Sequence, residues 1–127
     1  MKDSNKLSII IVSWNVADYL DQCLASIYKY CYFDFEVIVI DNNSADNSVE
    51  LLQTKYPNVN LIRNEINQGF AKANNQGVDI STGDVLLFLN PDTELIDNSL
   101  EQSLDYLRNK IKTGLLGINV LNSDSTN

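Results

Sequence analysis

The sequence has no histidine and few basic residues, and both shortages restrict what the protein can do. Without histidine, the chain lacks the side chain most used as a general base near neutral pH and a preferred ligand of zinc, copper and iron. Any metal site must be built from oxygen ligands, which favours Mg²⁺ or Mn²⁺. Nine basic against seventeen acidic side chains leave a net charge of −8. Such a chain lacks the basic surface that nucleic acids and anionic membranes require, so we expect no nucleic acid partner.

Cysteine is also scarce, and the two cysteines, Cys23 and Cys31, fall within one expected helix. Eight residues of helix separate their Cα atoms by about 12 Å, whereas a disulfide requires less than about 7 Å. We therefore predict two reduced, structural thiols. The sequence has no apolar run as long as a membrane span and no signal peptide before its first expected strand, which predicts a cytoplasmic location.

The size and composition of the chain predict one domain over residues 1–127. Surface scaling leaves about two-thirds of the unfolded chain's surface buried, enough for one hydrophobic core. Five short apolar runs predict strands, at residues 7–12, 36–40, 59–63, 85–89 and 115–121. The runs are continuous rather than alternating, as expected of strands that are covered on both faces.

Each gap between these runs contains a predicted helix. The four helices are one with a buried stripe through Leu20, Leu24, Ile27 and Cys31, one from an N-cap at Ser44 to Lys55, one over residues 70–80, and one that begins at Asp97 or Asn98 and ends near Asn109. Strands and helices that alternate at this spacing predict an α/β fold. We expect an open, mostly parallel sheet with helices on both faces.

Polar clusters follow four of the five predicted strands. Open α/β sheets bind ligands beyond the carboxyl ends of their strands, so these clusters are expected to meet at one edge. Any one cluster also suits a simple turn, because Asn, Asp and Ser favour turns. Four clusters together, one with an aromatic residue, favour a ligand site. They are Ser13-Trp14-Asn15, the segment 41–46, Arg63-Asn64 followed by the segment 67–70, and Asn90-Pro91-Asp92.

Several nucleotide-binding and phosphoacceptor motifs are absent. The first turn, SWNVADYL, contains no G-x-G-x-x-G, and no G-x-x-x-x-G-K-[ST] occurs anywhere. A phosphoacceptor receiver domain would need an acidic pair after the first strand and a lysine after the fifth. The chain has Ser13-Trp14 and Asn122-Ser123 at those places. These absences exclude the usual dinucleotide-binding, P-loop and receiver proteins.

The side chains that remain suit a nucleoside diphosphate. Asp41 would accept the ring N–H of uracil or thymine, and Trp14 would stack on the base. Asp92 would offer a hard oxygen to a divalent cation that also holds the phosphates, with Asn90 as a weaker neighbour. Trp14 has an alternative as a core residue, and Asp92 has one as the cap of its turn. For Asp46, a role in capping the following helix is favoured over a role in binding.

These motifs resemble the amino-terminal half of the family 2 glycosyltransferases, whose nucleotide-sugar-binding domain has the Rossmann-like GT-A fold. LSIIIVSWN is similar to the family's first strand and T/S-aromatic-Asn turn, and VIVIDNNSADNS is similar to its V-D-[DN]-x-S-x-D segment. NQGFAKANNQG and STGDVLLFLNPD match its N-x-G-x-x-x-A-x-N-x-G segment and its D-x-D signature. The resemblance covers residues 7–120. The N-P-D variant is similar to members that resemble rhamnosyltransferases and galactofuranosyltransferases.

The resemblance implies roles for individual residues. It assigns no catalytic residue in this chain, because the family's base follows the fifth strand and its acceptor site lies in a second half. Asn74 stands where many members have an arginine. The implied contacts are Ser13, Trp14 and Asp41 for the base, Asn67, Gly69 and Asn75 for the ribose and phosphates, and Asp92 with Asn90 for Mg²⁺ or Mn²⁺.

The implied function is transfer of a sugar from a UDP- or dTDP-sugar to a glycan or lipid-linked acceptor, with inversion at the anomeric carbon. Cell wall or polysaccharide biosynthesis is the expected setting, and the acceptor would bring the protein to the inner face of the membrane. Two alternatives remain open. One is a nucleotide-sugar-binding module without catalysis, because the chain is expected to end before the base. The other is a scaffold with no affinity for nucleotides.

Overall fold

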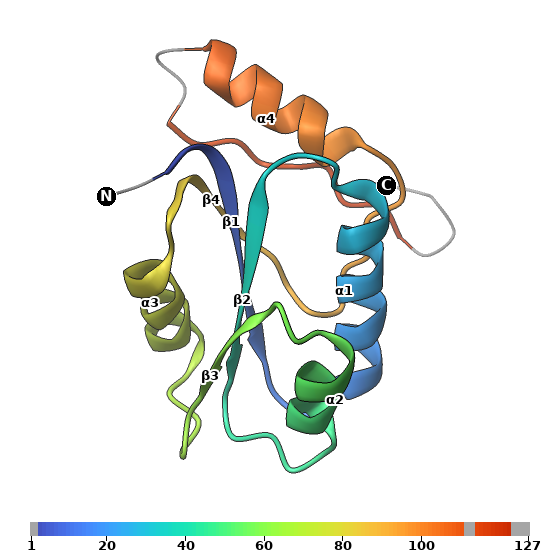
Figure 1. Cartoon of the computed structure of the whole chain (residues 1–127), viewed down its shortest axis with the longest axis vertical. Helices are drawn as coiled ribbons and strands as arrows, with labels where there is room; N and C mark the ends of the chain where they lie inside the picture. The colour runs from blue at the N-terminus through green and yellow to red at the C-terminus, as the bar shows by residue number, and fades with distance from the viewer. Residues whose placement is uncertain (1–2, 111–113, 123–127) are drawn as a thin grey trace. The chain divides into compact units, whose positions relative to one another are not determined.

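A computed structural model describes residues 3–110 and 114–122 of the chain (Figure 1). The chain divides into two compact units, one that ends at Ile96 and one that begins at Asp97. One domain over residues 1–127 stays a prediction. The elements in chain order are β1 (Asp3–Ser13), α1 (Ala17–Tyr30), β2 (Phe35–Asp41), α2 (Ser48–Lys55), β3 (Asn60–Arg63), α3 (Phe70–Ile80), β4 (Gly83–Phe88) and α4 (Ser99–Asn109).

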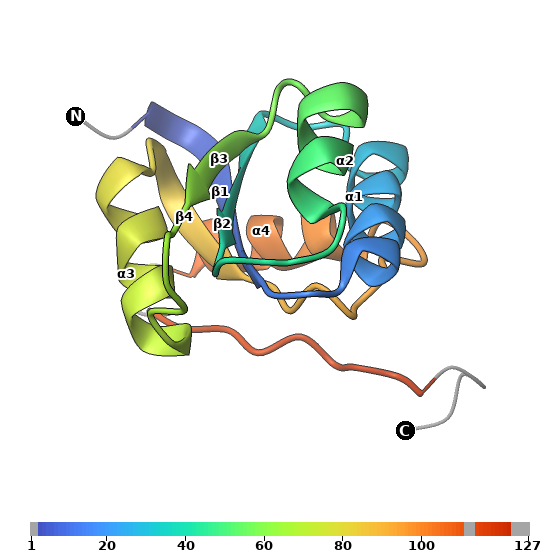
Figure 2. The ribbon, with the colours of Figure 1, turned by 90° about the horizontal axis from the view of Figure 1, so that it is seen from below.

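The four strands form one parallel sheet in the order β3-β2-β1-β4. Helices α1 and α2 lie on one face of this sheet and α3 lies on the other (Figure 2). The predicted α/β fold with helices on both faces is therefore confirmed. The strand order reverses between β1 and β4, which places the switch point of the sheet beside the carboxyl end of β1.

The core sits around the two central strands. Every described side chain of β1 from Leu7 to Ile11 is buried, as is β2 from Val37 to Asp41. The continuous apolar runs at residues 7–12 and 36–40 thus correctly predicted strands covered on both faces. The edge strands β3 and β4 are only half-buried.

A close approach of α3 to the sheet explains the glycine in its centre. A Cβ atom on Gly77 would lie 2.6 Å from Ile10 Cγ2 and 3.0 Å from Ile40 Cδ1. Both isoleucines are fully buried in the cluster that also holds Ala73 of α3. The last glycine of the N-x-G-x-x-x-A-x-N-x-G segment therefore serves packing.

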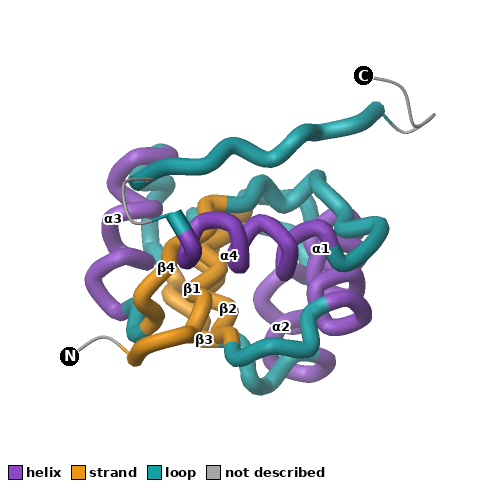
Figure 3. Tube along the Cα trace, turned by 90° about the horizontal axis from the view of Figure 1, so that it is seen from above, coloured by secondary structure: helices purple, strands orange, loops and turns teal. Residues whose placement is uncertain are grey.

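Two predicted elements differ in the structure. The strand expected over residues 115–121 is not formed. The described residues 114–122 contain neither helix nor strand (Figure 3). An apolar run becomes a strand only where its backbone finds a ladder partner, and Leu115 and Val120 remain exposed. Helix α2 begins at Ser48 rather than directly after Ser44, and its N-cap is Asn47. The Ser44 hydroxyl instead accepts a hydrogen bond from the backbone of Asn15.

The cysteine prediction is confirmed, since neither Cys23 nor Cys31 forms a disulfide bond and both are buried. Cys31 lies one residue beyond the end of α1, as its C-cap. Burial raises the pKa of the Cys23 thiol to about 11, which keeps it protonated near neutral pH. Across residues 3–110 and 114–122, none of the helices has the length and apolar character that crossing a membrane requires.

Candidate nucleotide site at the carboxyl edge of the sheet

The carboxyl ends of β1 and β2 bring Ser13 and Asp41 together. The two residues are register partners in the parallel sheet, so their side chains leave the same face. Both are buried, and Asp41 is only 2% exposed. Asp41 Oδ2 accepts a hydrogen bond from the Ser44 amide at 2.9 Å. Asp41 Oδ1 and Ser13 Oγ have no hydrogen-bond partner among the described residues.

These two orphaned atoms are the unusual feature of the edge. A buried polar atom without a partner costs about 1–3 kcal/mol, and more when it is charged. Asp41 Oδ1 is an acceptor, and the Ser13 hydroxyl either donates or accepts. The pair therefore matches a ligand that presents an N–H group beside a carbonyl, as the imide edge of uracil or thymine does.

Side chains from two loops join the β1–α1 turn to the β2–α2 loop. Asn15 has a left-handed φ of 53°, which asparagine tolerates better than most residues. Its amide donates to Ser44 Oγ at 3.0 Å, and its Oδ1 accepts from the Ala45 amide at 2.7 Å. The asparagine of the aromatic-Asn turn thus fixes both the turn and the neighbouring loop, and with them the position of Trp14.

Asp46 completes this connection and caps two helices. Its Oδ2 accepts from the Ala17 amide at 3.0 Å, and its Oδ1 accepts from the Ser48 amide at 3.0 Å. Burial opposes ionisation of Asp46, but hydrogen bonds from Ser48 and the Ala17 amide outweigh it and hold the pKa below its ordinary value. The favoured capping role of Asp46 is confirmed.

A pocket of about 580 Å³ lies at the switch point of the sheet. Trp14 is 55% exposed in it, so its interpretation as a core residue is wrong. Sequence reasoning missed Tyr19, which is 57% exposed in the first turn of α1 and off the buried stripe of that helix. A single aromatic residue off the buried stripe of a helix carries no pattern that would have marked it as part of a site. The lining residues are Trp14, Val16, Tyr19, Asn90, Pro91 and Asp92.

The Asn90-Pro91-Asp92 segment forms a turn that Thr93 closes. The Thr93 amide and hydroxyl both donate to the Asn90 carbonyl, at 3.2 and 2.7 Å. The Asp92 carboxylate forms no hydrogen bond with the described residues and is exposed, so it does not act as the cap of this turn. Asp92 is one of the residues that line the pocket at the switch point.

The residues present fit a cation only in part. Asp92 and Asn90 offer hard oxygens, which suit Mg²⁺ or Mn²⁺. Within the described residues, however, no group of three His, Cys, Asp or Glu side chains is placed to hold a metal ion. The site therefore fits a cation that takes most of its ligands from a bound diphosphate.

The predicted ligand contacts between residues 67 and 75 are not among the described residues that line the pocket at the switch point. Asn67 Oδ1 accepts a hydrogen bond from the Gly69 amide at 2.9 Å, and Gly69 has a φ of 80° as the N-cap of α3. Asn67 thus shapes the turn into α3. Asn75 is exposed on α3 and does not line the pocket at the switch point.

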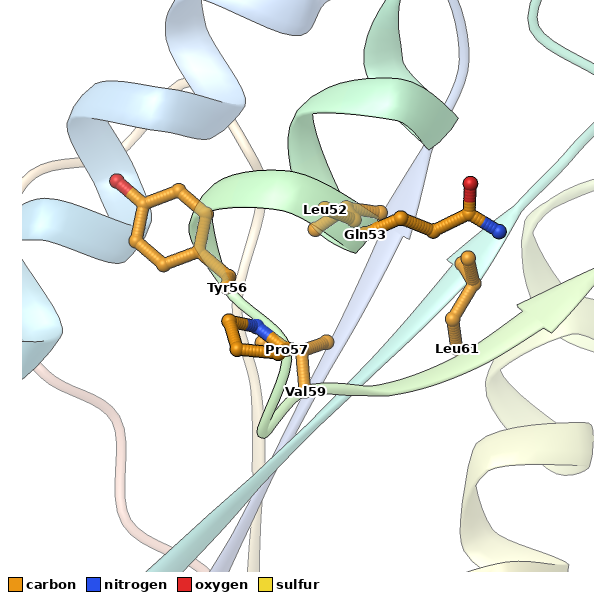
Figure 4. Close-up of a pocket in the computed structure, with 6 residues that line it drawn as sticks. All are labelled: Leu52, Gln53, Tyr56, Pro57, Val59 and Leu61. Atoms are coloured by element: carbon orange, nitrogen blue, oxygen red, sulfur yellow. The ribbon is translucent and has the colours of Figure 1, made fainter.

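A second, smaller pocket of about 200 Å³ lies between the end of α2 and β3 (Figure 4). Among the described residues that line this pocket, none is charged and none is a predicted site residue. It does not resemble a site for a charged ligand. The residues that line it are Leu52, Gln53, Tyr56, Pro57, Val59 and Leu61.

The fold and the polar carboxyl edge define a class of protein, the GT-A glycosyltransferases. The structure of S. aureus TarS 1-349 in complex with UDP-GlcNAc matches with a TM-score of 0.73 and 25% identity, over 82% of this chain and 31% of that chain. The chain itself belongs to glycosyl transferase family 2, whose sequence profile matches residues 8–127. The family expectation is therefore confirmed.

Curated relatives agree with this assignment. The uncharacterized glycosyltransferase YibD of Escherichia coli is 34% identical over 116 residues, which cover 83% of this chain and 33% of YibD. A PGL/p-HBAD biosynthesis glycosyltransferase of Mycobacterium bovis is 39% identical over 93 residues, which cover 71% of this chain and 36% of that protein. The chain thus spans about a third of the length of these relatives.

Proposed function

We propose that this chain binds the donor of a glycosyltransferase that moves a sugar from UDP or dTDP to a glycan or lipid-linked acceptor. The observation that carries the proposal is the buried, unpartnered Oδ1 of Asp41 beside the unpartnered Ser13 hydroxyl. A relative of the same fold, TarS, was solved with UDP-GlcNAc, which supports a uridine nucleotide. Cell wall or polysaccharide biosynthesis is the proposed setting.

The base would occupy the carboxyl edge between β1 and β2. Asp41 Oδ1 accepts the imide N–H, Ser13 adds a contact to a neighbouring carbonyl, and Trp14 stacks on the ring. Because Asp41 is 2% exposed, its side chain must turn toward the strand edge as the base arrives. Asn67 and Gly69 in the turn into α3, together with Asn75 on that helix, would face the ribose and phosphates.

The proposed transfer is a direct displacement that inverts the anomeric carbon. The acceptor hydroxyl oxygen forms a bond to that carbon, the bond to the diphosphate oxygen breaks, and the hydroxyl proton passes to a base that we assign to none of the described residues. Asp92, with Asn90, would hold a Mg²⁺ or Mn²⁺ ion that neutralises the leaving diphosphate. Donor binding is therefore the step that this chain's own residues perform.

Base selectivity tests the proposal. Cytosine lacks the imide N–H, so we expect UDP and dTDP to bind well above CDP and ADP in calorimetry with Mn²⁺ present. In Asp41→Asn, one carbonyl oxygen must serve both the Ser44 amide and the base, and a hydrogen bond to a charged group is worth about 1.5–3 kcal/mol. That loss predicts affinity for UDP at least about tenfold weaker. Equal affinity for all four nucleotides would refute the assignment of Asp41.

A matched control for this substitution lies on α3. Asp79→Asn removes the same charge from an exposed residue near the carboxyl end of the helix, and should leave the affinity for UDP unchanged. Turnover with UDP-sugars and candidate acceptors then separates the two remaining functions. Binding without transfer or donor hydrolysis by the 127-residue chain would favour a donor-binding module, and no affinity for any nucleotide would favour a scaffold.

A further inference from the structure

Three carboxamide side chains form a network beside Asp41. Asn42 follows Asp41 directly, is 2% exposed, and points to the opposite face of the sheet, where α3 lies. Asn64 follows β3, and Gln76 lies on α3. The network thus joins the carboxyl ends of two strands to a helix. Asn42 and Asn64 belong to the predicted polar clusters, but neither they nor Gln76 was assigned a contact with the ligand.

Asn64 is the centre of the network, because its side chain is hydrogen-bonded to both Asn42 and Gln76. Asn64 Nδ2 donates to Asn42 Oδ1 at 2.9 Å and to Gln76 Oε1 at 2.8 Å, which uses both of its hydrogens. Gln76 Nε2 donates back to Asn64 Oδ1 at 2.9 Å. Asn64 and Gln76 therefore form a reciprocal pair, and a carboxylate at either position would break one of the two bonds.

Asn42 connects this pair to the segment that leads into α3. Asn42 Oδ1 also accepts from the Gln68 amide at 3.2 Å, and Asn42 Nδ2 donates to the Gly69 carbonyl at 3.3 Å. The main chain adds two bonds, from the Asn42 amide to the Ser13 carbonyl and from the Asn64 amide to the Asp41 carbonyl, both 2.9 Å. A shift of the network would therefore move both the 64–69 segment and the backbone of Asp41.

We propose that Asn42, Asn64 and Gln76 are positioning residues that hold the 64–69 segment against the end of β2 and so preorganise the nucleotide site. This inference rests on the proposed binding of a nucleoside diphosphate at Asp41. The network uses one buried carboxamide, Asn42, and two half-buried ones, Asn64 and Gln76, to fix a short loop at the ligand edge. A preorganised loop lowers the entropy that a ligand must otherwise remove on binding.

The test compares UDP binding in three variants of the 127-residue chain by calorimetry. Gln76→Met keeps the side-chain length and helix propensity but removes the reciprocal pair, and Asn64→Ala removes the same pair from the loop side. Each should weaken UDP binding about fivefold, the worth of one neutral hydrogen bond. The double variant should lose little more than Asn64→Ala alone, because Asn64→Ala already removes both bonds of the reciprocal pair together with the bond to Asn42.

A control distinguishes positioning from general stability. Thr82→Val removes a 3.0 Å hydrogen bond from Thr82 Oγ1 to Glu36 at the amino end of the sheet. It should lower the melting temperature as the network variants do, yet leave the affinity for UDP unchanged. Hydrogen exchange of the Gln68 and Gly69 amides gives a readout without ligand. Exchange should be faster than in the parent in Gln76→Met and in Asn64→Ala, and unchanged in Thr82→Val.

The outcomes separate this inference from the proposed function. A parent chain that does not bind UDP overturns the proposed function, and the inference with it, before any variant is measured. A parent that binds UDP, with variants that bind equally well, overturns the positioning role and leaves the proposed function intact. Unchanged exchange at Gln68 and Gly69 in both folded variants also overturns it.

Discussion

Removal of divalent cations is expected to weaken UDP binding through Asp92. Asp92 is exposed in the pocket at the switch point, and the whole chain carries −8, so the site repels an anionic ligand. Two unit charges about 4 Å apart repel by about 1 kcal/mol in water and about 4 kcal/mol at an effective dielectric constant of 20. The exposure of Asp92 places it toward the lower value.

A bridging cation replaces that repulsion with an attraction of similar size. The combined change is about 2 kcal/mol, or about 25-fold in affinity. Asp92→Asn should therefore cross over: it should bind UDP more weakly than the parent in Mn²⁺ and more tightly than the parent in EDTA. Calorimetry in both buffers measures the crossover, and Asp79→Asn controls for the loss of one charge.

Two results would refute this reasoning. Equal affinity of the parent for UDP in EDTA and in Mn²⁺ would show that no cation is shared with the diphosphate. An Asp92→Asn variant that keeps the full dependence on Mn²⁺ would show that another residue recruits the ion. In the second case the donor oxygens of Asn90 become the next to test.

Three further outcomes are expected. Gly77→Ala should lower the free energy of unfolding by about 1–3 kcal/mol in urea titration, because its Cβ would overlap Ile10. Burial opposes ionisation of Glu36, but hydrogen bonds from Ser8 and Thr82 hold its pKa below the ordinary value, so this stabilisation is present above pH about 4.3 and is lost as pH falls through the lowered pKa. Glu36→Gln should therefore be less stable than the parent at pH 7, with a gap that closes in acid. Trp14→Ala should weaken UDP binding by about 1–3 kcal/mol, while Trp14→Phe keeps most of it.

The sequence predicted the central elements because local pattern and tertiary environment agree there. The runs that became β1 and β2 are β-branched and continuous, and helices cover both faces of those strands. Residues 70–80 were predicted as a helix, and α3 has those bounds. The run at 115–121 carries the same local signal without a ladder partner. Hydrophobicity alone does not state whether a backbone neighbour exists, so that strand was wrongly predicted.

The candidate site was predictable to the extent that strand ends determine it. Ser13 and Asp41 meet because parallel register places them side by side, and Trp14 meets Asp92 because β4 lies next to β1. Tyr19 was missed because one exposed aromatic residue on a helix carries no pattern. The hydrogen-bond partners of the Asn67 side chain could not be predicted from the sequence either, because asparagine suits both a turn and a contact with a ligand.

The structure distinguishes turn formation from ligand contact, because it shows which polar groups already have hydrogen-bond partners within the protein. Asn15 and Asp46 use their oxygens to join loops on one face of the sheet, and Asn42 uses both ends of its carboxamide on the other face. Between them, Asp41 Oδ1 is left without a partner in the described chain. Evolution toward stability alone would pair or remove such an atom, because its cost is not recovered in the free protein. A buried acceptor that stays without a partner, beside an unpartnered Ser13 hydroxyl and among loops whose other polar groups are paired, is the expected mark of a group whose partner arrives with the ligand.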